Sequence, residues 1–367
     1  MRPGRALLAV VGFDALPHRD GRLSKIKHLQ RTLGVPSIGP KTPAVRQVEI
    51  DENSAGQRLD NFLLRTLKGV PKSHVYRVIR SGEVRVNRGR AAADTRLAEG
   101  DVVRVPPVRV ATPDAAGDRA PTPPREFPVL MEDEHLLAID KPAGVAVHGG
   151  SGVSFGVIEQ LRQARPQARF LELVHRLDKE TSGVLLLAKK RAALTTLQDQ
   201  FRRHAGDAPM RKTYLALVKG DWPANRKVID LPLVKHDAAG GERTVSVADA
   251  ATPSARRAIT LVRVAEALAG FSLLEVTLKT GRTHQIRVHL AAHGQPIAGD
   301  DRYGDFALNR SLAKGEAVPA VRFDRMFLHA AALRFAHPTG GATIELQAPL
   351  PPECEGLLDA LRAAGPR

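Results

Sequence analysis

The chain has 367 residues, of which 43% are hydrophobic, so it is long enough for two folded domains with apolar cores. Its net charge of +16 indicates a polyanionic partner, and nucleic acid fits this charge better than a membrane surface does. The single cysteine, Cys354, excludes an internal disulfide and is typical of a reducing compartment. No apolar run approaches the roughly 20 residues that a membrane-spanning helix needs, so we expect no association with a membrane.

The first 46 residues are basic, contain several prolines and show little periodicity. We predict a disordered tail that touches phosphate groups without a fixed structure. Residues 1–13 are only weakly similar to a signal peptide, because no small-residue cleavage site follows them and Asp14 comes next. The protein is therefore expected in the cytoplasm.

Residues 47–106 predict a small domain of two helices and short strands. Apolar residues at helical spacing predict a first helix around Leu59 and Leu67, and Pro71 opens a second helix that Gly82 ends. Basic and polar side chains recur every three to four residues on the second helix, which is typical of an RNA-binding face but equally of a solvated one. The candidate RNA-binding residues of this helix and of the strand after it are Lys72, Ser73, Arg77, Arg80 and Arg85.

Residues 107–127 contain five prolines and few large apolar side chains, which predicts a semi-rigid linker. The chain from residue 128 onward is expected to form one domain, which starts with two strands around an acidic turn in residues 129–142. The Gly-rich stretch 148–156 lacks both the G-K-[ST] ending of a P-loop and the G-x-G-x-x-G spacing. We therefore predict a backbone turn there, near the functional site, and no nucleotide site.

The stretch His175–Gly183 (HRLDKETSG) leads into an apolar run that is typical of a short, fully buried strand. It places Asp178 in a turn among cations, and nearby positive charge favours the ionised carboxylate. Such a carboxylate can act as a nucleophile, although an Asp in a turn can also simply bond to the backbone. The H-R-D loop of protein kinases does not fit, because Leu177 separates Arg176 from Asp178 and no D-F-G follows.

Further along the chain, an amphipathic helix is predicted around residues 193–201, and a strand over residues 212–218. This strand contains Tyr214, which by default is a core aromatic with a satisfied hydroxyl. Residues 224–270 show no clear pattern, whereas residues 271–278 are typical of a strand.

A helix is predicted from about Thr283 to His293, and two closing strands and a final helix complete the chain. His289 and His293 have the spacing of a zinc helix, but no Glu lies between them and no Cys or further His cluster follows. We therefore expect no metal site. From the pattern alone, Arg287 is a cation on the helix surface.

Three segments, HRLDKETSG, KTYLALVKG and LKTGRTHQIRVHL, occur in this order and resemble the signature of the RluA-type pseudouridine synthases. Residues 57–106 are similar to the small αL RNA-binding domain that precedes many of these enzymes. The residues of several further segments most resemble those of the RluC-like branch, which acts on large-subunit (23S) ribosomal RNA.

The resemblance implies an α+β fold, in which an αL-type RNA-binding domain precedes a catalytic domain (residues 128–367) with a mixed, mainly antiparallel β-sheet and a central cleft. It implies site-specific isomerisation of uridine to pseudouridine, with Asp178 as the catalytic carboxylate and Arg287 as its ion-pair partner. Tyr214 would stack on the target uracil and help to remove a proton, and Arg176 would fill the space left by the flipped uridine. Whether Asp178 attacks C1′ or abstracts a sugar proton stays open.

The reaction neither oxidises the uridine nor adds an atom to it, so we expect no cofactor. The expected partner is large-subunit ribosomal RNA or a ribosome-assembly intermediate, and the protein is expected to be a monomer. Two alternatives stay open: the same chemistry on transfer RNA, and a non-catalytic RNA-binding factor in ribosome assembly. The second alternative predicts loss of Asp178, Tyr214 or Arg287, all of which are present.

Overall fold

The structure is a computed structural model. The predicted tail, residues 1–46, lies outside the described residues up to position 43, and the predicted linker lies outside them from 109 to 121. No helix among the described residues is both long and apolar enough to cross a membrane. The described ranges are 44–67, 69–108, 122–150, 153–202, 210–237, 243–249, 251–319 and 321–365.

Residues 44–108 form a small antiparallel sheet with two helices and a hydrophobic core of its own. The strand β3 (Val102–Val105) is central and pairs with β1 (Arg46–Glu49) on one side and β2 (Arg85–Val86) on the other. The helices α1 (Leu59–Thr66) and α2 (Lys72–Arg80) bury the apolar positions that the helical spacing predicted.

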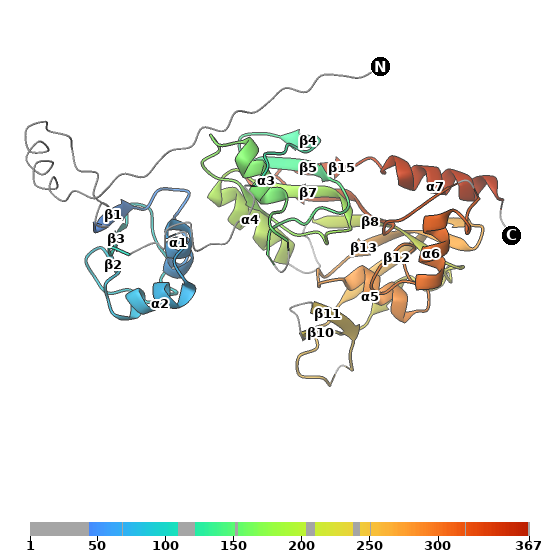
Figure 1. The fold of residues 1–367 in the computed structure, drawn as a ribbon, viewed down its shortest axis with the longest axis horizontal. Coiled ribbons are helices and arrows are strands. Elements are labelled where there is room, and N and C mark those ends of the chain that lie inside the picture. Colours follow the sequence, from blue (N-terminus) through green and yellow to red (C-terminus); the bar gives the residue numbers. More distant parts are fainter. Residues whose placement is uncertain are drawn as a thin grey trace, which may run out of the picture. The chain divides into compact units, whose positions relative to one another are not determined.

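Residues 122–365 are organised around one ten-stranded sheet (Figure 1). All its pairs among the described strands are antiparallel except one, so the sheet is mixed and mainly antiparallel, as predicted. Along its path the strands are β4 (Val129–Glu132), β5 (Leu136–Lys141), β7 (Ser182–Ala188), β14 (Leu328–Ala336), β8 (Arg211–Lys219), β13 (Phe271–Leu278), β12 (Ile259–Leu268) and β9 (Val228–Asp230), with β15 (Thr343–Gln347) beside β14 and β6 (Glu172–Leu173) beside β7.

The apolar run before and after Leu185 is continuous because β7 is buried on both faces. Successive side chains of a strand point to opposite faces, and those of β7 alternate between two hydrophobic clusters. The helix α4 (Arg191–Arg202) contributes to one cluster, and α3 (Val157–Ala164) and α7 (Pro352–Ala363) contribute to the other. The polar turn that contains Asp178 is therefore followed directly by a buried strand of the sheet.

Two helices and a small separate sheet also belong to this part of the chain. The helix α5 (Gln285–Ala292) follows β13, and α6 (Phe306–Lys314) follows a loop after it. The strands β10 (Leu233–Asp237) and β11 (Arg243–Val247) form a separate two-stranded antiparallel sheet. This sheet and β9 lie in the part of the chain where the sequence showed no clear pattern.

Candidate active site

A cavity of about 380 Å³ is lined by the turn before β7, by β8, and by the segment that leads into α5. The three residues with predicted catalytic roles, Asp178, Tyr214 and Arg287, all line it. Arg176 lines it too and is exposed. The structure thus brings together three segments that are far apart in the sequence, around residues 176–178, 214 and 287.

The turn that carries Asp178 is held mainly through its backbone. The carbonyl of Asp178 accepts a hydrogen bond from the Thr181 N–H at 3.1 Å. The carbonyl of Lys179 accepts one from the Nζ of Lys141 at 3.0 Å. Neither bond uses the Asp178 carboxylate, so the side chain keeps both of its oxygens for the cavity.

Lys141, the last residue of β5, is fully buried. Its Nζ also donates to the carbonyls of Pro142 and Val145, each at 2.8 Å. Burial lowers the pKa of Lys141 to about 7, while its three carbonyl acceptors favour the ammonium form. Lys141 therefore joins the loop after β5 to the turn of Asp178, a role that the sequence did not indicate.

Two more contacts fix the start of β7. Gly183 has a φ of 107°, and a Cβ there would lie 2.3 Å from the carbonyl oxygen of Ala330. Only glycine permits this close parallel pairing of β7 with β14. Ser182 is buried and its hydroxyl lies 2.9 Å from the Nδ1 of buried His329.

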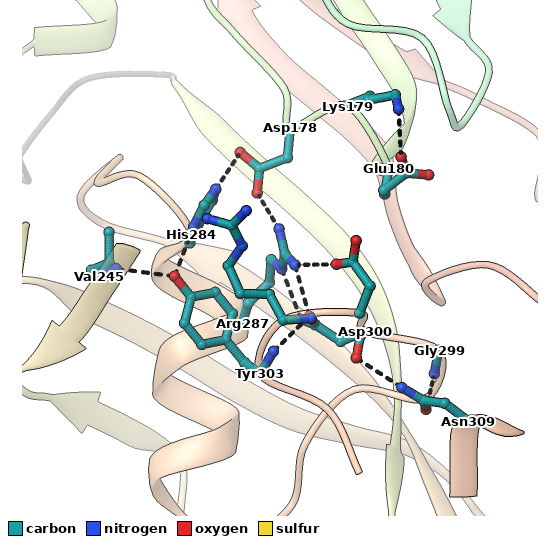
Figure 2. Close-up of polar contacts among 12 residues, drawn as sticks. Asp178, Lys179, Glu180, Val245, His284, Arg287, Gly299, Asp300, Tyr303 and Asn309 are labelled. Carbon is teal, nitrogen blue, oxygen red and sulfur yellow. Dashed lines mark hydrogen bonds and ion pairs between the residues drawn. The ribbon is translucent and has the colours of Figure 1, made fainter. Parts of the chain in front are cut away.

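Arg287 is held by short contacts to a second carboxylate (Figure 2). Its Nε and Nη2 each donate to Asp300 at 2.7 Å, and Nη2 also lies 3.1 Å from Asp301. The remaining nitrogen, Nη1, lies 3.6 Å from Oδ2 of Asp178. The predicted pairing of Arg287 with Asp178 is thus a looser ion pair, and the tight partner of Arg287 is Asp300.

Burial and charge act in opposite directions on the Arg287–Asp300 pair. Burial by itself lowers the pKa of Arg287. The hydrogen bond and charge of Asp300, together with the charges of Asp178 and Asp301, outweigh burial and raise this pKa above its ordinary value. Burial raises the pKa of Asp300, but the hydrogen bond and charge of Arg287 lower it to below its ordinary value. Both groups are therefore charged at neutral pH, although Arg287 is only 5% exposed and Asp300 is fully buried.

The loop that carries Asp300 is braced by its own backbone. The carboxylate of Asp300 accepts the N–H groups of Arg302 and Tyr303 at 2.9 Å each. Its carbonyl accepts a hydrogen bond from the Asn309 side chain on α6 at 2.8 Å (Figure 2). Gly299 has a φ of 75°, where a side chain would collide with the backbone of Arg325. The anchor of the Arg287 guanidinium is therefore rigid.

Tyr214 lies on β8 and belongs both to the core and to the cavity wall. It is 9% exposed, so the default expectation of a core aromatic holds for the ring. Burial raises the pKa of its hydroxyl, and the negative charge of Asp178 adds to the effect. Tyr214 is therefore a neutral phenol at physiological pH.

A cation and two rings form another part of the cavity wall. The Nζ of Lys212 lies 5.3 Å from the centre of the Phe201 ring, which stacks on His175 with ring centres 4.8 Å apart. Burial lowers the pKa of Lys212. The Nε2 of His175 accepts the Leu186 N–H at 3.1 Å, so His175 ties the turn to β7.

His284 and Tyr303 lie beside Asp178, and the sequence gave neither a role. The Nε2 of His284 lies 3.9 Å from Oδ1 of Asp178, and its Nδ1 lies 2.9 Å from the Tyr303 hydroxyl. The Tyr303 ring lies against the Arg287 guanidinium, 5.2 Å from ring centre to Cζ. His284 belongs to the segment LKTGRTHQIRVHL that carried the third part of the resemblance, and that is the signal that could have found it.

The Gly-rich stretch and His289 have structural partners. The Glu159 carboxylate on α3 accepts the N–H groups of Gly149 and Gly156, at 3.0 Å and 2.8 Å. The Nδ1 of His289 lies 2.8 Å from the Thr260 hydroxyl, and its Nε2 lies 3.1 Å from the Leu231 carbonyl. Among the described residues, no group of three or more His, Cys, Asp or Glu side chains is arranged to hold a metal ion.

The remaining candidate residues lie in the first folded part and are all exposed. Four of them belong to α2, where the residues on the other face are buried. Arg85 lies on β2, where its guanidinium donates to the carbonyl of Arg88 at 3.2 Å. The structure places these five residues, Lys72, Ser73, Arg77, Arg80 and Arg85, in solvent.

Comparison with known proteins connects both parts to RNA modification. A family model described as RNA pseudouridylate synthase matches residues 135–292, and the S4 domain model matches residues 57–103. The ribosomal large subunit pseudouridine synthase C of Pasteurella multocida is 48% identical over 326 residues, which are 87% of this chain and 94% of that protein. Its namesake in Yersinia pestis is 50% identical over 323 residues, which are 87% and 97% of the two proteins.

A solved structure is similar to this chain as well. The human RNA pseudouridylate synthase domain containing 4 protein superposes with a TM-score of 0.51 and 27% sequence identity. The match covers 64% of this chain and 93% of that one.

Proposed function

The chain belongs to the RluA-type RNA pseudouridine synthases, and we propose that it isomerises specific uridines of large-subunit ribosomal RNA at the cavity around Asp178. The relatives whose names carry this substrate match 87% of the chain. The observation that carries the proposal is the Asp178 carboxylate, which faces a buried, permanently charged guanidinium inside a cavity.

In this proposal the ionised Asp178 acts at the sugar–base junction. The bond between N1 and C1′ breaks, the uracil turns, and a new bond forms between C5 and C1′. C5 loses a proton and N1 gains one, so atoms and electrons balance without an external reagent. Arg287 places a positive charge 3.6 Å from Oδ2 of this carboxylate. Attack on C1′ and abstraction of a sugar proton both fit these positions.

The cavity suits one nucleotide taken out of its helix. Its volume of about 380 Å³ lies at the lower end of the range, roughly 300–1,000 Å³, of sites that enclose a small ligand. A paired uridine cannot reach Asp178, so the base must flip out at a cost of a few kcal/mol. Tyr214 offers its ring for stacking and its neutral hydroxyl to assist proton transfer, and exposed Arg176 fills the vacated position in the RNA.

The S4 part positions the enzyme on its RNA through phosphate contacts. We assign this role to the exposed residues of α2 and β2 named above. We further propose that the enzyme is a cytoplasmic monomer, and that its substrate is large-subunit ribosomal RNA or an assembly intermediate. The names of the relatives favour this substrate over transfer RNA. The presence of Asp178, Tyr214 and Arg287 in one cavity disfavours a non-catalytic factor.

The direct test maps pseudouridine in large-subunit ribosomal RNA by primer extension after carbodiimide treatment. Strains carry the intact gene, a deletion or Asp178→Asn, which nearly preserves shape but removes the charge. We expect the same few stops to vanish in the deletion and in the Asp178→Asn strain. Wild-type modification by Asp178→Asn would refute the catalytic assignment, and an unchanged ribosomal pattern in the deletion strain would redirect the search to transfer RNA.

A further inference from the structure

A chain of polar contacts runs from the β10–β11 sheet to the catalytic carboxylate (Figure 2). The Val245 N–H on β11 donates to the Tyr303 hydroxyl oxygen at 3.1 Å. The same hydroxyl lies 2.9 Å from the Nδ1 of His284. The other ring nitrogen of His284, Nε2, lies 3.9 Å from Oδ1 of Asp178. Four segments of the chain thus meet in one line of contacts.

The donors and acceptors along this line favour one direction for these contacts. The Tyr303 oxygen already accepts the Val245 N–H, so its own O–H is free to donate, and Nδ1 of His284 is the acceptor at hydrogen-bond distance. If Nδ1 accepts, the single proton of the neutral imidazole lies on Nε2. That N–H faces the Asp178 carboxylate. The opposite tautomer would place the lone pair of Nε2 against the negative charge of Asp178.

The surroundings of His284 favour the neutral ring. Burial lowers the pKa of His284 and outweighs the neighbouring carboxylates, and Arg287 on the same helix acts in the same direction. Asp178 on the turn before β7 and Asp300 on the loop after α5 oppose the effect, while Arg302 on that loop adds to it. The net effect keeps the pKa below the ordinary value of histidine, so the ring is neutral at physiological pH.

The backbone of His284 is also unusual. It has a φ of 52° and a ψ of 20°, the left-handed conformation that side chains other than glycine rarely adopt. Buried Gln285 fixes this corner, because its side chain bonds to Thr280 and Arg282 on one side and to Ile259 and Thr260 on the other. Backbone strain that is held so firmly often marks a functional position. Here it aims the imidazole into the cavity.

We propose that His284 is a positioning residue for Asp178, and that the Tyr303 hydroxyl selects the tautomer in which Nε2 of His284 donates to Oδ1. Arg287 faces Oδ2 at 3.6 Å, so the two donors orient the plane of the carboxylate once both contacts shorten. The distance of 3.9 Å is longer than a hydrogen bond, and catalytic contacts commonly shorten when substrate binds. The role in catalysis rests on the proposed function, whereas the tautomer is a property of the protein alone.

The tautomer is tested first, by NMR of protein with ¹⁵N-labelled histidine, in which long-range couplings distinguish Nε2–H from Nδ1–H. The His284→Asn spectrum identifies the signal, since asparagine tolerates the left-handed backbone. We expect the Nε2–H tautomer in the wild type and a shift toward Nδ1–H in Tyr303→Phe. A charged ring at pH 7, or an Nδ1–H tautomer in the wild type, overturns the proposal whatever the RNA substrate is.

The catalytic role is tested by single-turnover kinetics on a ribosomal RNA substrate. Tyr303→Phe keeps the ring beside Arg287 and removes only the hydroxyl. We expect it to lower the rate constant about tenfold, with unchanged affinity for RNA. His284→Gln supplies the matched control, because an amide nitrogen is a donor without any choice of tautomer.

The decisive comparison is a double-mutant cycle. In the His284→Gln background, Tyr303→Phe should have almost no further effect on the rate constant. Equal losses in both backgrounds would mean that Tyr303 acts through the β10–β11 sheet and would overturn the proposal. If wild-type protein fails to modify any ribosomal RNA, the proposed function fails, while the NMR result still decides the tautomer.

Discussion

The two charged partners at the centre of the site are held in opposite ways. The turn of Asp178 is fixed through backbone groups, by Thr181 and Lys141. Among the described residues, its carboxylate makes only two long ion-pair contacts, of 3.6 Å and 3.9 Å. Arg287 is fixed through its side chain, by two bonds of 2.7 Å to buried Asp300. The guanidinium of Arg287 is therefore held by a buried partner, whereas the Asp178 carboxylate makes no contact of hydrogen-bond length with a described residue.

Removal of the Arg287 guanidinium should have the largest effect on stability. Arg287→Met leaves Asp300 buried and without its charged partner, and breaking a buried ion pair costs about 4 kcal/mol. We expect this loss in the free energy of unfolding, measured by urea denaturation, together with loss of pseudouridine formation. Arg287→Lys is the matched control, because it keeps the charge but not the two-pronged geometry. Equal stability of Arg287→Met and wild type would contradict the description of the pair.

Acid should lower the stability of the region that carries the Asp178 turn. There the Nδ1 of His329 lies at hydrogen-bond distance from the Ser182 hydroxyl at the start of β7. Burial lowers the pKa of His329 to about 4, against about 6.5 in the unfolded chain. Between these values the unfolded state binds a proton that the folded state does not, so stability falls as the pH falls from 6.5 to 4. One proton over this range is worth about 3 kcal/mol.

Urea denaturation across this pH range measures the effect. His329→Gln should reduce the slope of stability against pH by the contribution of one proton. An unchanged slope would mean that His329 titrates normally in the folded protein.

The smallest of these effects is expected from Lys141. This residue bonds to the backbone of the Asp178 turn and does not line the cavity. Lys141→Met keeps the aliphatic stem but leaves three buried carbonyls without their donor. Since one unsatisfied buried group costs about 1–3 kcal/mol and the loop can relax, we expect a net loss of about 2 kcal/mol. The rate constant should fall while the affinity for RNA stays constant, because the turn shifts without losing a substrate contact. A fall in affinity with a constant rate would contradict this role.

Local patterns were sufficient to predict the elements that carry the site. The apolar run after Ser182 is a strand buried on both faces, and residues 271–278 form the predicted strand exactly as bounded. The fold class and the αL-type domain, which came from the resemblance, are confirmed by the sheet and by the family matches. Arg287 came from the resemblance as well, since the helical pattern alone suggested a surface position.

The partners of these residues could not be predicted because they depend on contacts between distant segments. Nothing around Lys141 in the sequence shows that its ammonium will bind a carbonyl at position 179. Nothing in the sequence distinguishes Asp300 from the other acidic residues, because its contact with Arg287 depends on the path of the loop after α5. The helix expected from Thr283 starts at Gln285, because His284 adopts the left-handed conformation that residue patterns do not reveal.

The central claim is that Asp300 holds Arg287 so that one nitrogen of its guanidinium faces the Asp178 carboxylate. Asp300→Asn tests it most directly, since this change nearly preserves shape and removes the charge that fixes the guanidinium. We expect the single-turnover rate constant on ribosomal RNA to fall about 100-fold, while the affinity for RNA is unchanged and the protein remains folded by circular dichroism. A wild-type rate constant in folded Asp300→Asn protein would contradict the account, because Arg287 would then face Asp178 without its anchor.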